Sequence, residues 1–274
     1  MARQLVMDAM IRRADFWQRG KDKVTAPHET SARHISTIAL DNLKSDSSIV
    51  LSLRKPDFQR ETNQWSPSQA VTFIKSFIDG DLVPSIILWA SIDGLIFVID
   101  GAHRISALRA WIEDDYGDGA TSISFFNGEI PAEQKKAAKA MRLAVEREIG
   151  TYKSYQEKNK ARANNPSIQF DEVVARRLGH IITRQLDLQW VTGNEEVAEA
   201  SFFKINTQGT PLDKTEEKLL RNRNRSHAIA ARSIIRAATG HKYWSKFDEQ
   251  TKTNIETLSS EINNILFHPE LTIQ

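Results

Sequence analysis

The clearest pattern of apolar and polar positions lies in residues 95–111. Residues 95–99 are all apolar and rich in β-branched side chains, which predicts a buried strand. That strand ends abruptly at Asp100 and Gly101. Behind the glycine, apolar side chains recur at helical spacing, at Ile105, Leu108 and Trp111. The pattern therefore predicts a strand, a glycine turn and a helix in direct succession.

The start of that helix is a candidate anion-binding site. The first backbone N–H groups of a helix have no partner within it, and the helix dipole favours negative charge there. Gly101 would let a ligand approach the backbone. Arg104 and Arg109 are expected on the polar side of the helix. The planar guanidinium of Arg104 can form two parallel hydrogen bonds to a phosphate or carboxylate. His103 can donate a hydrogen bond or a proton. A plain turn, with Arg104 solvated and His103 packed, explains the same residues equally well.

Elsewhere the pattern alternates between strands and helices. Asp93-Gly94 between two β-rich runs predicts a hairpin, and Ser66 followed by Pro67 predicts a capped helix start. Strands are predicted at residues 49–54, 85–91, 121–126, 149–156 and 186–191. Helices are predicted at residues 4–19, 35–44, 67–78, 131–148, 171–179, 195–204 and 249–266, with two more in residues 212–243. These elements indicate an α+β fold in which a small mixed sheet with flanking helices precedes a helical C-terminal part.

The composition narrows the class of protein. With 274 residues and 40% hydrophobic content, the chain can bury a sizeable core. Its 37 basic and 35 acidic residues leave a formal net charge of +2, so the overall charge does not mark a nucleic-acid binder. The absence of cysteine excludes disulfides and thiolate metal sites and fits a reducing cytoplasm. No segment has the length and apolarity of a membrane span, so we expect a soluble, cytoplasmic protein.

Three parts are expected along the chain. Residues 1–45 are predicted to form a helical arm for packing or oligomerisation, residues 46–211 the central domain, and residues 212–274 a helical, basic C-terminal part. The densest positive run is RNRNR in this last part. Its arginines are candidates for nucleic-acid binding, although a solvated helix junction explains them equally well: Arg221, Arg223 and Arg225.

Three short pieces of the sequence carry a resemblance to a known family. They are FQRETNQWSPSQAVTFIKSFIDGDLVPSIILWASIDG, DGAHR at residues 100–104, and SFFKINTQGTPLDKTE at residues 201–216. In this order they resemble the DGQQR-motif domain of GmrSD-type modification-dependent restriction proteins, a branch of the ParB/sulfiredoxin-like superfamily, over roughly residues 49–222. Ala102 and His103 stand where DGQQR or DGQHR is expected, so one side-chain amide that could bind a base, sugar or phosphate is missing.

The resemblance implies further residues of a nucleotide pocket. Gln59 and Arg60, followed by a tryptophan like Trp65, match a pair that borders the pocket in that family. Asn206 matches the first residue of an N-x-x-G motif at its edge. Taken without the resemblance, Gln59 and Arg60 would be solvated surface residues and Asn206 would end a helix.

These features lead to one expected function and one alternative. We expect a nucleotide-binding, NTP-hydrolysing regulatory domain of a DNA-directed defence or restriction system, without specifying the nucleotide. Arg104 and the N–H groups after Gly101 would hold phosphates, and Arg60 would neutralise developing charge. Asp100 would bind Mg²⁺ or orient water, and His103 would polarise a phosphate oxygen or move a proton.

The alternative is a DNA-binding or modified-DNA-sensing module without turnover, which Ala102 favours. A nuclease activity of this chain itself is disfavoured, because no His-Asn-His or D-(D/E)xK-like arrangement is visible in the sequence. The expected partners are a nucleotide, DNA, a nuclease domain or subunit, and a second copy of the chain.

Overall fold

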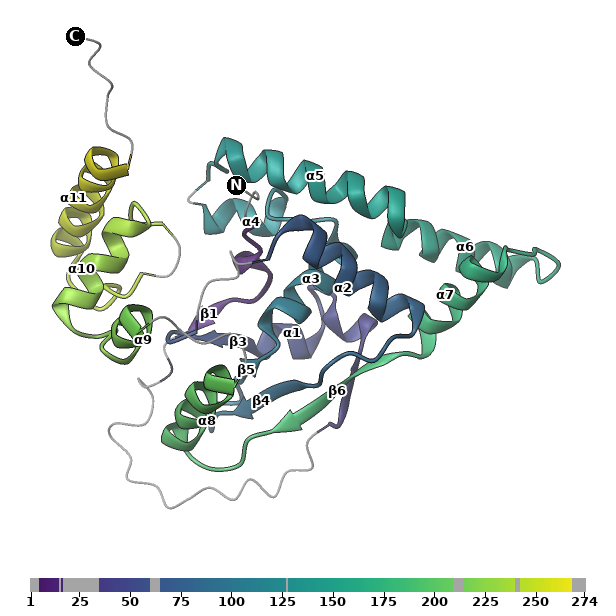
Figure 1. The fold of residues 1–274 in the computed structure, drawn as a ribbon, viewed down its shortest axis with the longest axis horizontal. Helices are drawn as coiled ribbons and strands as arrows, with labels where there is room; N and C mark the ends of the chain where they lie inside the picture. Colours follow the sequence, from purple (N-terminus) through teal and green to yellow (C-terminus); the bar gives the residue numbers. More distant parts are fainter. Residues whose placement is uncertain are drawn as a thin grey trace, which may run out of the picture.

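A six-stranded mixed sheet forms the centre of the molecule (Figure 1). The computed structural model describes residues 5–14, 16, 35–59, 65–126, 128–208, 214–239 and 242–267, except for the side chains of residues 206–208 and 216. Along the sheet the strands follow the order β1-β3-β5-β4-β6-β2. Their bounds are Arg13–Ala14 (β1), Thr37–Ala39 (β2), Leu53–Pro56 (β3), Ile86–Ala90 (β4), Ile96–Asp100 (β5) and Gln185–Trp190 (β6).

The strand pairing is both parallel and antiparallel. β1, β3 and β5 run parallel to one another, β4 is antiparallel to β5, β6 is parallel to β4, and β2 is antiparallel to β6. Both edge strands, β1 and β2, come from the first 45 residues, which were expected to be a helical arm. The predicted α+β class, a mixed sheet with flanking helices and a helical C-terminal part, is confirmed.

Helices cover both faces of the sheet and extend beyond it (Figure 1). A large apolar core joins one face to α2, α3 and α5, whereas a smaller one, rich in phenylalanine, joins the other face to α8. The helices are α1 (Ser48–Ser52), α2 (Pro67–Asp79), α3 (Ala102–Glu113), α4 (Ala120–Phe125), α5 (Ala132–Glu148), α6 (Tyr152–Asn164), α7 (Glu172–Thr183), α8 (Glu195–Gln208), α9 (Lys214–Arg221), α10 (Ser226–Ile235) and α11 (Glu249–Phe267). Short 3-10 helices occupy Asp8–Met10 and Leu40–Leu43.

Local sequence signals explain why the central elements form. The β4–β5 hairpin turns at Gly94, whose φ is 78°, and Val98 faces the large core while Phe97 faces the small one. Such two-sided burial explains the continuous apolar run of β5. In α2, Ser66 and Gln69 form a capping box, which confirms the predicted helix start.

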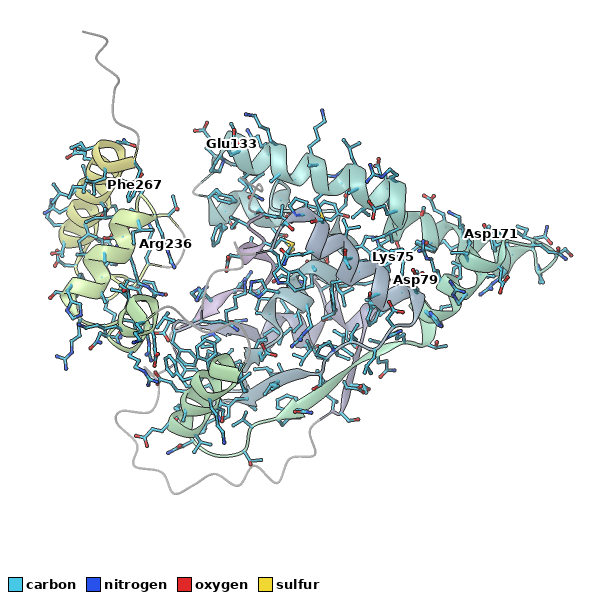
Figure 2. The ribbon with its side chains drawn as sticks, viewed as in Figure 1. Lys75, Asp79, Glu133, Asp171, Arg236 and Phe267 are labelled. Carbon is cyan, nitrogen blue, oxygen red and sulfur yellow. The ribbon has the colours of Figure 1, made fainter. Side chains whose placement is uncertain are left out.

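Figure 2 shows Lys75 and Asp79 one turn apart on α2. Their side chains form an ion pair of 2.6 Å. Asp79 also pairs with Arg177 of α7 at 2.6 Å, so a carboxylate at the end of α2 holds a helix that lies 98 residues further along the chain. The Arg177 guanidinium holds the pKa of Asp79 at about 2, below its usual range.

Two predicted strands are helices. Of residues 121–126, all but the last belong to α4, because the buried carboxylate of Asp115 accepts hydrogen bonds from four backbone N–H groups and one hydroxyl around the start of that helix. Asp115 thus stabilises the turn before α4, which the alternating pattern of residues 121–126 did not predict. Residues 149–156 mostly belong to α6, which Thr151 caps and whose Tyr152 packs edge-on against Trp111 with ring centroids 5.2 Å apart.

The N-terminal predictions are also wrong. Within residues 4–19, the described part forms a 3-10 helix and β1 instead of one amphipathic helix. The backbone N–H of Lys55 donates to the carbonyl oxygen of Arg12 at 2.8 Å, so pairing with β3 overrides the helical pattern. Residues 35–44 form β2 and a 3-10 helix, and residues 49–54 are divided between α1 and β3.

The C-terminal helices form a small unit beside the sheet domain (Figure 1). Their own core contains Ile229, Tyr243 and Trp244, and α10 packs along α11. A buried hydrogen bond of 2.8 Å joins the hydroxyls of Ser233 and Ser259. Figure 2 places Arg236 just after α10 and Phe267 at the end of α11. In the described part of the chain, every helix is too short or too polar to cross a membrane.

Replacement of Gly101 by alanine should destabilise the fold more than the same change at Gly94. Both glycines have positive φ, 97° and 78°, which costs an alanine about 1–2 kcal/mol. A Cβ at Gly101 would also lie 2.5 Å from Cδ1 of the buried Ile86, whereas a Cβ at Gly94 meets nothing within 4 Å. We therefore expect Gly101→Ala to cost about 1–3 kcal/mol more than Gly94→Ala in urea unfolding. Equal losses would contradict the packing described at Gly101.

Candidate functional site

Two loops from the sequence motifs meet at one edge of the sheet. One follows β3 and contains Gln59, and the other follows β5 and contains residues 100–104, here called the α3 corner. Because β3 and β5 are adjacent parallel strands, both loops leave the sheet at the same end. Ligands of open sheets with parallel strands commonly bind outside the carboxyl ends of those strands. The fold thus brings two of the three motifs together.

The guanidinium of Arg104 folds back over the α3 corner. Its Nη2 donates to a carboxylate oxygen of Asp100 at 2.6 Å and to the carbonyl oxygen of Ser85 at 3.2 Å. Its Nε is buried and has no hydrogen-bond partner among the described residues. A Cβ at Gly101 would lie 3.0 Å from this guanidinium and 2.5 Å from Ile86. The space expected for a ligand at Gly101 is therefore filled by side-chain atoms of the protein, and glycine is needed to admit them.

The first turn of α3 has no side-chain cap. Gly101 occupies the N-cap position and lacks a side chain, whereas Ser66, Thr151 and Asp171 cap α2, α6 and α7. Ala102 follows as the first helical residue and is 2% exposed. This helix start therefore has no side-chain acceptor from its N-cap residue, in contrast to those three helices.

His103 packs against an aromatic ring at the edge of the corner. Its imidazole stacks on the indole of Trp65 with ring centroids 5.4 Å apart and an interplanar angle of 21°. Burial, and next the positive charge of Lys55, lower the pKa of His103 to about 4. The ring is therefore neutral at pH 7. Its Nε2 is buried and has no hydrogen-bond partner in the described structure, so this nitrogen has bonding capacity that the described side chains do not use.

Gln59 lies inside the protein rather than on a solvated surface. The residue is 8% exposed, and its Oε1 is buried without a hydrogen-bond partner among the described residues. The loop that carries it is held by Arg13, whose Nη1 donates to the carbonyl oxygens of Pro56 at 3.1 Å and of Gln59 at 2.6 Å. The side chain of Gln59 is thus positioned by its backbone, and its amide oxygen is left available.

Other predicted pocket residues are only partly described. Arg60 lies outside the described residues. Asn206 lies in the last turn of α8 and not in a loop, because that helix continues to Gln208. Its side chain is outside the described part of the structure. α8 packs against β5, so the third motif lies on an element that contacts the strand leading into the α3 corner.

A buried ion pair behind the corner was not anticipated from the sequence. Lys55 of β3 has no exposed surface, and its Nζ lies 2.9 Å from Oδ1 of Asp8. Arg13 contacts the same carboxylate oxygen at 3.4 Å. The lysine is 47 residues from its partner and lies in a short strand before a proline, so no local pattern marks the pair.

The arginines of the RNRNR run have different environments. Arg223 is 3% exposed, and its guanidinium pairs with Asp57 at 2.9 Å and with Glu199 at 3.0 Å. Arg221 pairs with Glu217 at 2.8 Å and lies over the ring of Phe203. Arg225 is exposed at the N-cap of α10.

Arg223 therefore joins the C-terminal helices to the loop after β3. The hydroxyl of Tyr243 supports this link by donating to the carbonyl oxygen of Asp57 at 2.7 Å. Both partners of Arg223 are carboxylates inside the protein, so its charge is neutralised there. Arg221 and Arg225 are both exposed, but Arg221 is paired with Glu217, whereas Arg225 forms no ion pair with a described residue and so suits contact with a phosphate backbone.

Comparison with known proteins identifies the family. A family model described as "GmrSD restriction endonuclease, N-terminal domain" matches residues 39–224, which is more than half of the chain. The chain belongs to this family. No curated protein and no solved structure matched it. The GmrSD match contains the α3 corner, Gln59 and Asn206, whereas Asp8 and Arg13 precede it.

The GmrSD domain offers few ligands for a metal ion of its own. In the described ranges, no three His, Cys, Asp or Glu side chains form a group that could hold one. Asp100, the predicted Mg²⁺ ligand, is 41% exposed and paired with Arg104. Because Mg²⁺ in phosphate sites is commonly held by one or two carboxylates together with phosphate oxygens and water, a single aspartate fits an ion that arrives with a phosphate ligand.

The stability of the GmrSD domain should depend on pH through His103. Because the pKa of this ring is about 4 in the folded protein and 6.5 unperturbed, the unfolded chain takes up the proton first as the pH falls. The stabilisation from the neutral ring is therefore present above pH 6.5 and is lost between pH 6.5 and 4. We expect wild type to lose up to about 3 kcal/mol more than His103→Gln between pH 7 and 4 in urea unfolding. His227→Gln, which removes an exposed histidine, should follow wild type, and an identical pH profile for all three proteins would contradict the assignment.

Proposed function

We propose that this GmrSD domain binds a nucleoside triphosphate at the α3 corner, hydrolyses it, and thereby regulates DNA cleavage by its restriction system. Three buried polar atoms support the binding step: Oε1 of Gln59, Nε2 of His103 and Nε of Arg104. None has a hydrogen-bond partner among the described residues, and an unsatisfied buried polar group costs about 1–3 kcal/mol. A ligand with several hydrogen-bonding groups would recover part of that cost.

The position of these atoms favours a phosphate ligand. His103 and Arg104 belong to the first turn of a helix without a side-chain cap, where backbone N–H groups and the helix dipole favour an anion, and Gln59 lies on the loop that leaves the sheet at the same end. Arg104 supplies a formal positive charge at the same place. Trp65, half-buried and stacked on His103, provides an aromatic surface beside them. A polyphosphate at the helix start with a base near Trp65 would use each of these features.

Arg104 can exchange its present partner for a phosphate at low cost. Its ion pair with Asp100 joins the end of β5 to the first turn of α3, and the aspartate is 41% exposed. Ion pairs with a solvent-exposed partner typically contribute about 0–1 kcal/mol. A phosphate dianion or polyphosphate offers more charge and more acceptor oxygens than one carboxylate. We therefore expect the guanidinium to turn from Asp100 to the ligand, which frees the aspartate.

Hydrolysis would follow from the freed carboxylate. Asp100 would then orient a water molecule, and the neutral His103 would accept or relay a proton through its unpartnered Nε2. Mg²⁺ bound with the polyphosphate would neutralise the charge that develops on the phosphate oxygens.

Ala102 favours a second candidate function. This residue is apolar and 2% exposed at the first helical position of the corner, so its side chain supplies no polar contact to a ligand. A site of this kind suits a module that senses a nucleotide or a modified base without turnover. Binding and hydrolysis must therefore be measured separately.

A thermal-shift and phosphate-release assay with each of the four NTPs and Mg²⁺ tests both candidates. One NTP should raise the melting temperature of wild type, because a ligand at 100 times its Kd stabilises by about 2.7 kcal/mol. Arg104→Ala should weaken binding about ten- to a hundredfold through the lost charge-assisted hydrogen bonds. Gln59→Leu removes an unpartnered buried oxygen, so the free protein should remain as stable as wild type. The variant should nevertheless bind the same NTP more weakly.

The matched control is Arg147→Ala, which removes an arginine from a surface ion pair with Glu148 of the same 2.6 Å length. It should bind and release phosphate like wild type. Binding without phosphate release would eliminate the hydrolysis step and leave the sensing module. No thermal shift with any NTP would overturn nucleotide binding altogether.

DNA binding, which membership of a restriction family suggests, is proposed to involve Arg225. In a gel-shift series with duplex DNA, Arg225→Ala should reduce the salt dependence of binding by about one counterion. Its stability should stay within about 0.5 kcal/mol of wild type, because the residue is exposed. Arg223→Ala should instead lower stability by about 3–5 kcal/mol, because it removes the arginine from its largely buried ion pairs with Asp57 and Glu199. An unchanged salt slope for Arg225→Ala would remove that residue from the DNA interface.

A further inference from the structure

A cleft outside the α3 corner has the features of a second ligand site. It has a volume of about 640 Å³, within the usual range for small-molecule pockets, and lies between the N-terminal segment, α1, α3 and α4. Part of its lining, Asp8 to Arg13, precedes the residues that match the GmrSD family. We call it the arginine cleft, because Arg12, Arg13 and Arg109 line it.

The charge in the cleft is not balanced by its own carboxylate. Asp8 is the acidic residue of the lining, and it is already paired with Lys55 behind the wall at 2.9 Å and with Arg13 at 3.4 Å. Arg13 is further committed to the carbonyl oxygens of Pro56 and Gln59. The two remaining cations of the lining are Arg12 and Arg109.

Arg109 is a buried guanidinium that no carboxylate contacts in an ion pair within the described structure. It is 5% exposed, and it donates to the carbonyl oxygen of Met10 and, at 3.0 Å, to the hydroxyl of Ser45. Its Nε is buried without any hydrogen-bond partner in the described part of the chain. Burial lowers the pKa of Arg109, the charges of Glu113 and Asp115 raise it, and the charge of Arg12, which lines the same cleft, lowers it.

The two carboxylates whose charges act on Arg109 accept hydrogen bonds from other groups. Glu113 accepts a hydrogen bond of 2.7 Å from the backbone N–H of Ser45. Asp115 accepts the backbone N–H groups at the start of α4, including that of Thr121 at 3.0 Å. The start of α4 therefore offers no free anion site. An anion in the cleft would be held by the guanidinium groups and the hydroxyls of the lining.

Another part of the lining is apolar. It includes Val50 and Leu51 of α1 and Phe125 of α4, and Leu51 is 56% exposed. An exposed leucine and a half-buried phenylalanine beside two cations suit a ligand with an anionic group at one end and an apolar or aromatic body at the other.

We propose that the arginine cleft binds a phosphate monoester whose phosphate lies between Arg12 and Arg109 and whose body contacts Leu51 and Phe125. Among the described residues neither guanidinium forms an ion pair with a carboxylate, and two such positive charges match the dianion of a phosphate monoester better than the single charge of a carboxylate. The hydroxyl of Ser45, already held by Arg109, can reorient to donate to a phosphate oxygen. This site is separate from the α3 corner and does not depend on the function proposed there.

Calorimetric titration of the whole chain with phenyl phosphate tests this site. Phenyl phosphate should bind at least tenfold more tightly than benzoate, which has the same ring and one charge, and more tightly than inorganic phosphate, which lacks the ring. Arg12→Gln should weaken the binding of phenyl phosphate about ten- to a hundredfold, which is the effect of losing one charge-assisted interaction. Because Arg12 is exposed, this variant should keep its fold.

Two further variants distinguish the cleft from other cationic sites. Arg176→Gln removes an exposed arginine of α7, which lies away from α4 in Figure 1, and should bind phenyl phosphate like wild type. Arg104→Gln, which alters the α3 corner, should also retain binding. Loss of binding in Arg104→Gln but not in Arg12→Gln would place the ligand at the corner and overturn the proposal. Equal affinities for wild type and Arg12→Gln, or no binding at millimolar concentrations, would overturn it as well.

Discussion

One buried ion pair connects the main features of this structure. Lys55 has no exposed surface, Asp8 is 5% exposed, and their charged atoms are 2.9 Å apart. Charges at this depth are costly to desolvate, so each requires the other. The pair holds the N-terminal segment beside β3, and Asp8 belongs to the lining of the arginine cleft. Burial is the main cause of the lowered pKa of His103, which the charge of Lys55 lowers further and that of Asp8 raises. A single electrostatic contact therefore links the sheet edge, the α3 corner and the cleft.

The elements that the sequence predicted correctly are those with strong local causes. Asp93-Gly94 specified the β4–β5 hairpin, Ser66 and Pro67 specified the start of α2, and the change of apolar period at Gly101 specified α3. Each depends on backbone preferences or side-chain bonds within a few residues. These elements also carry most of the α3 corner, so its position in the fold could be predicted. Its internal geometry, with the Arg104 guanidinium folded over the glycine, could not.

The predictions that were wrong concern residues whose structure depends on distant partners. Residues 121–125 of the alternating run are helical because Asp115 accepts hydrogen bonds from N–H groups at the start of α4. Residues 8–14 leave the helical pattern because β3 offers an edge. Arg109 was placed on the polar side of α3, yet it is 5% exposed because Met10, 99 residues earlier, accepts from its guanidinium. The periodicity of apolar residues in a sequence indicates which face of a helix is polar on average. It does not reveal that a distant carbonyl group can bury one polar side chain of that face.

The distribution of arginine partners decides where this protein can bind an anion. Arg177 and Arg223 are held by carboxylates in largely buried pairs, so releasing either for a ligand would leave a buried charge uncompensated. Arg104 is held by a half-exposed aspartate, which costs little to replace. Arg109 has no carboxylate in contact in the described structure, so a ligand there breaks no ion pair. Anion binding is therefore expected where partners are weak or missing, and the density of positive charge in RNRNR is a poor guide to it.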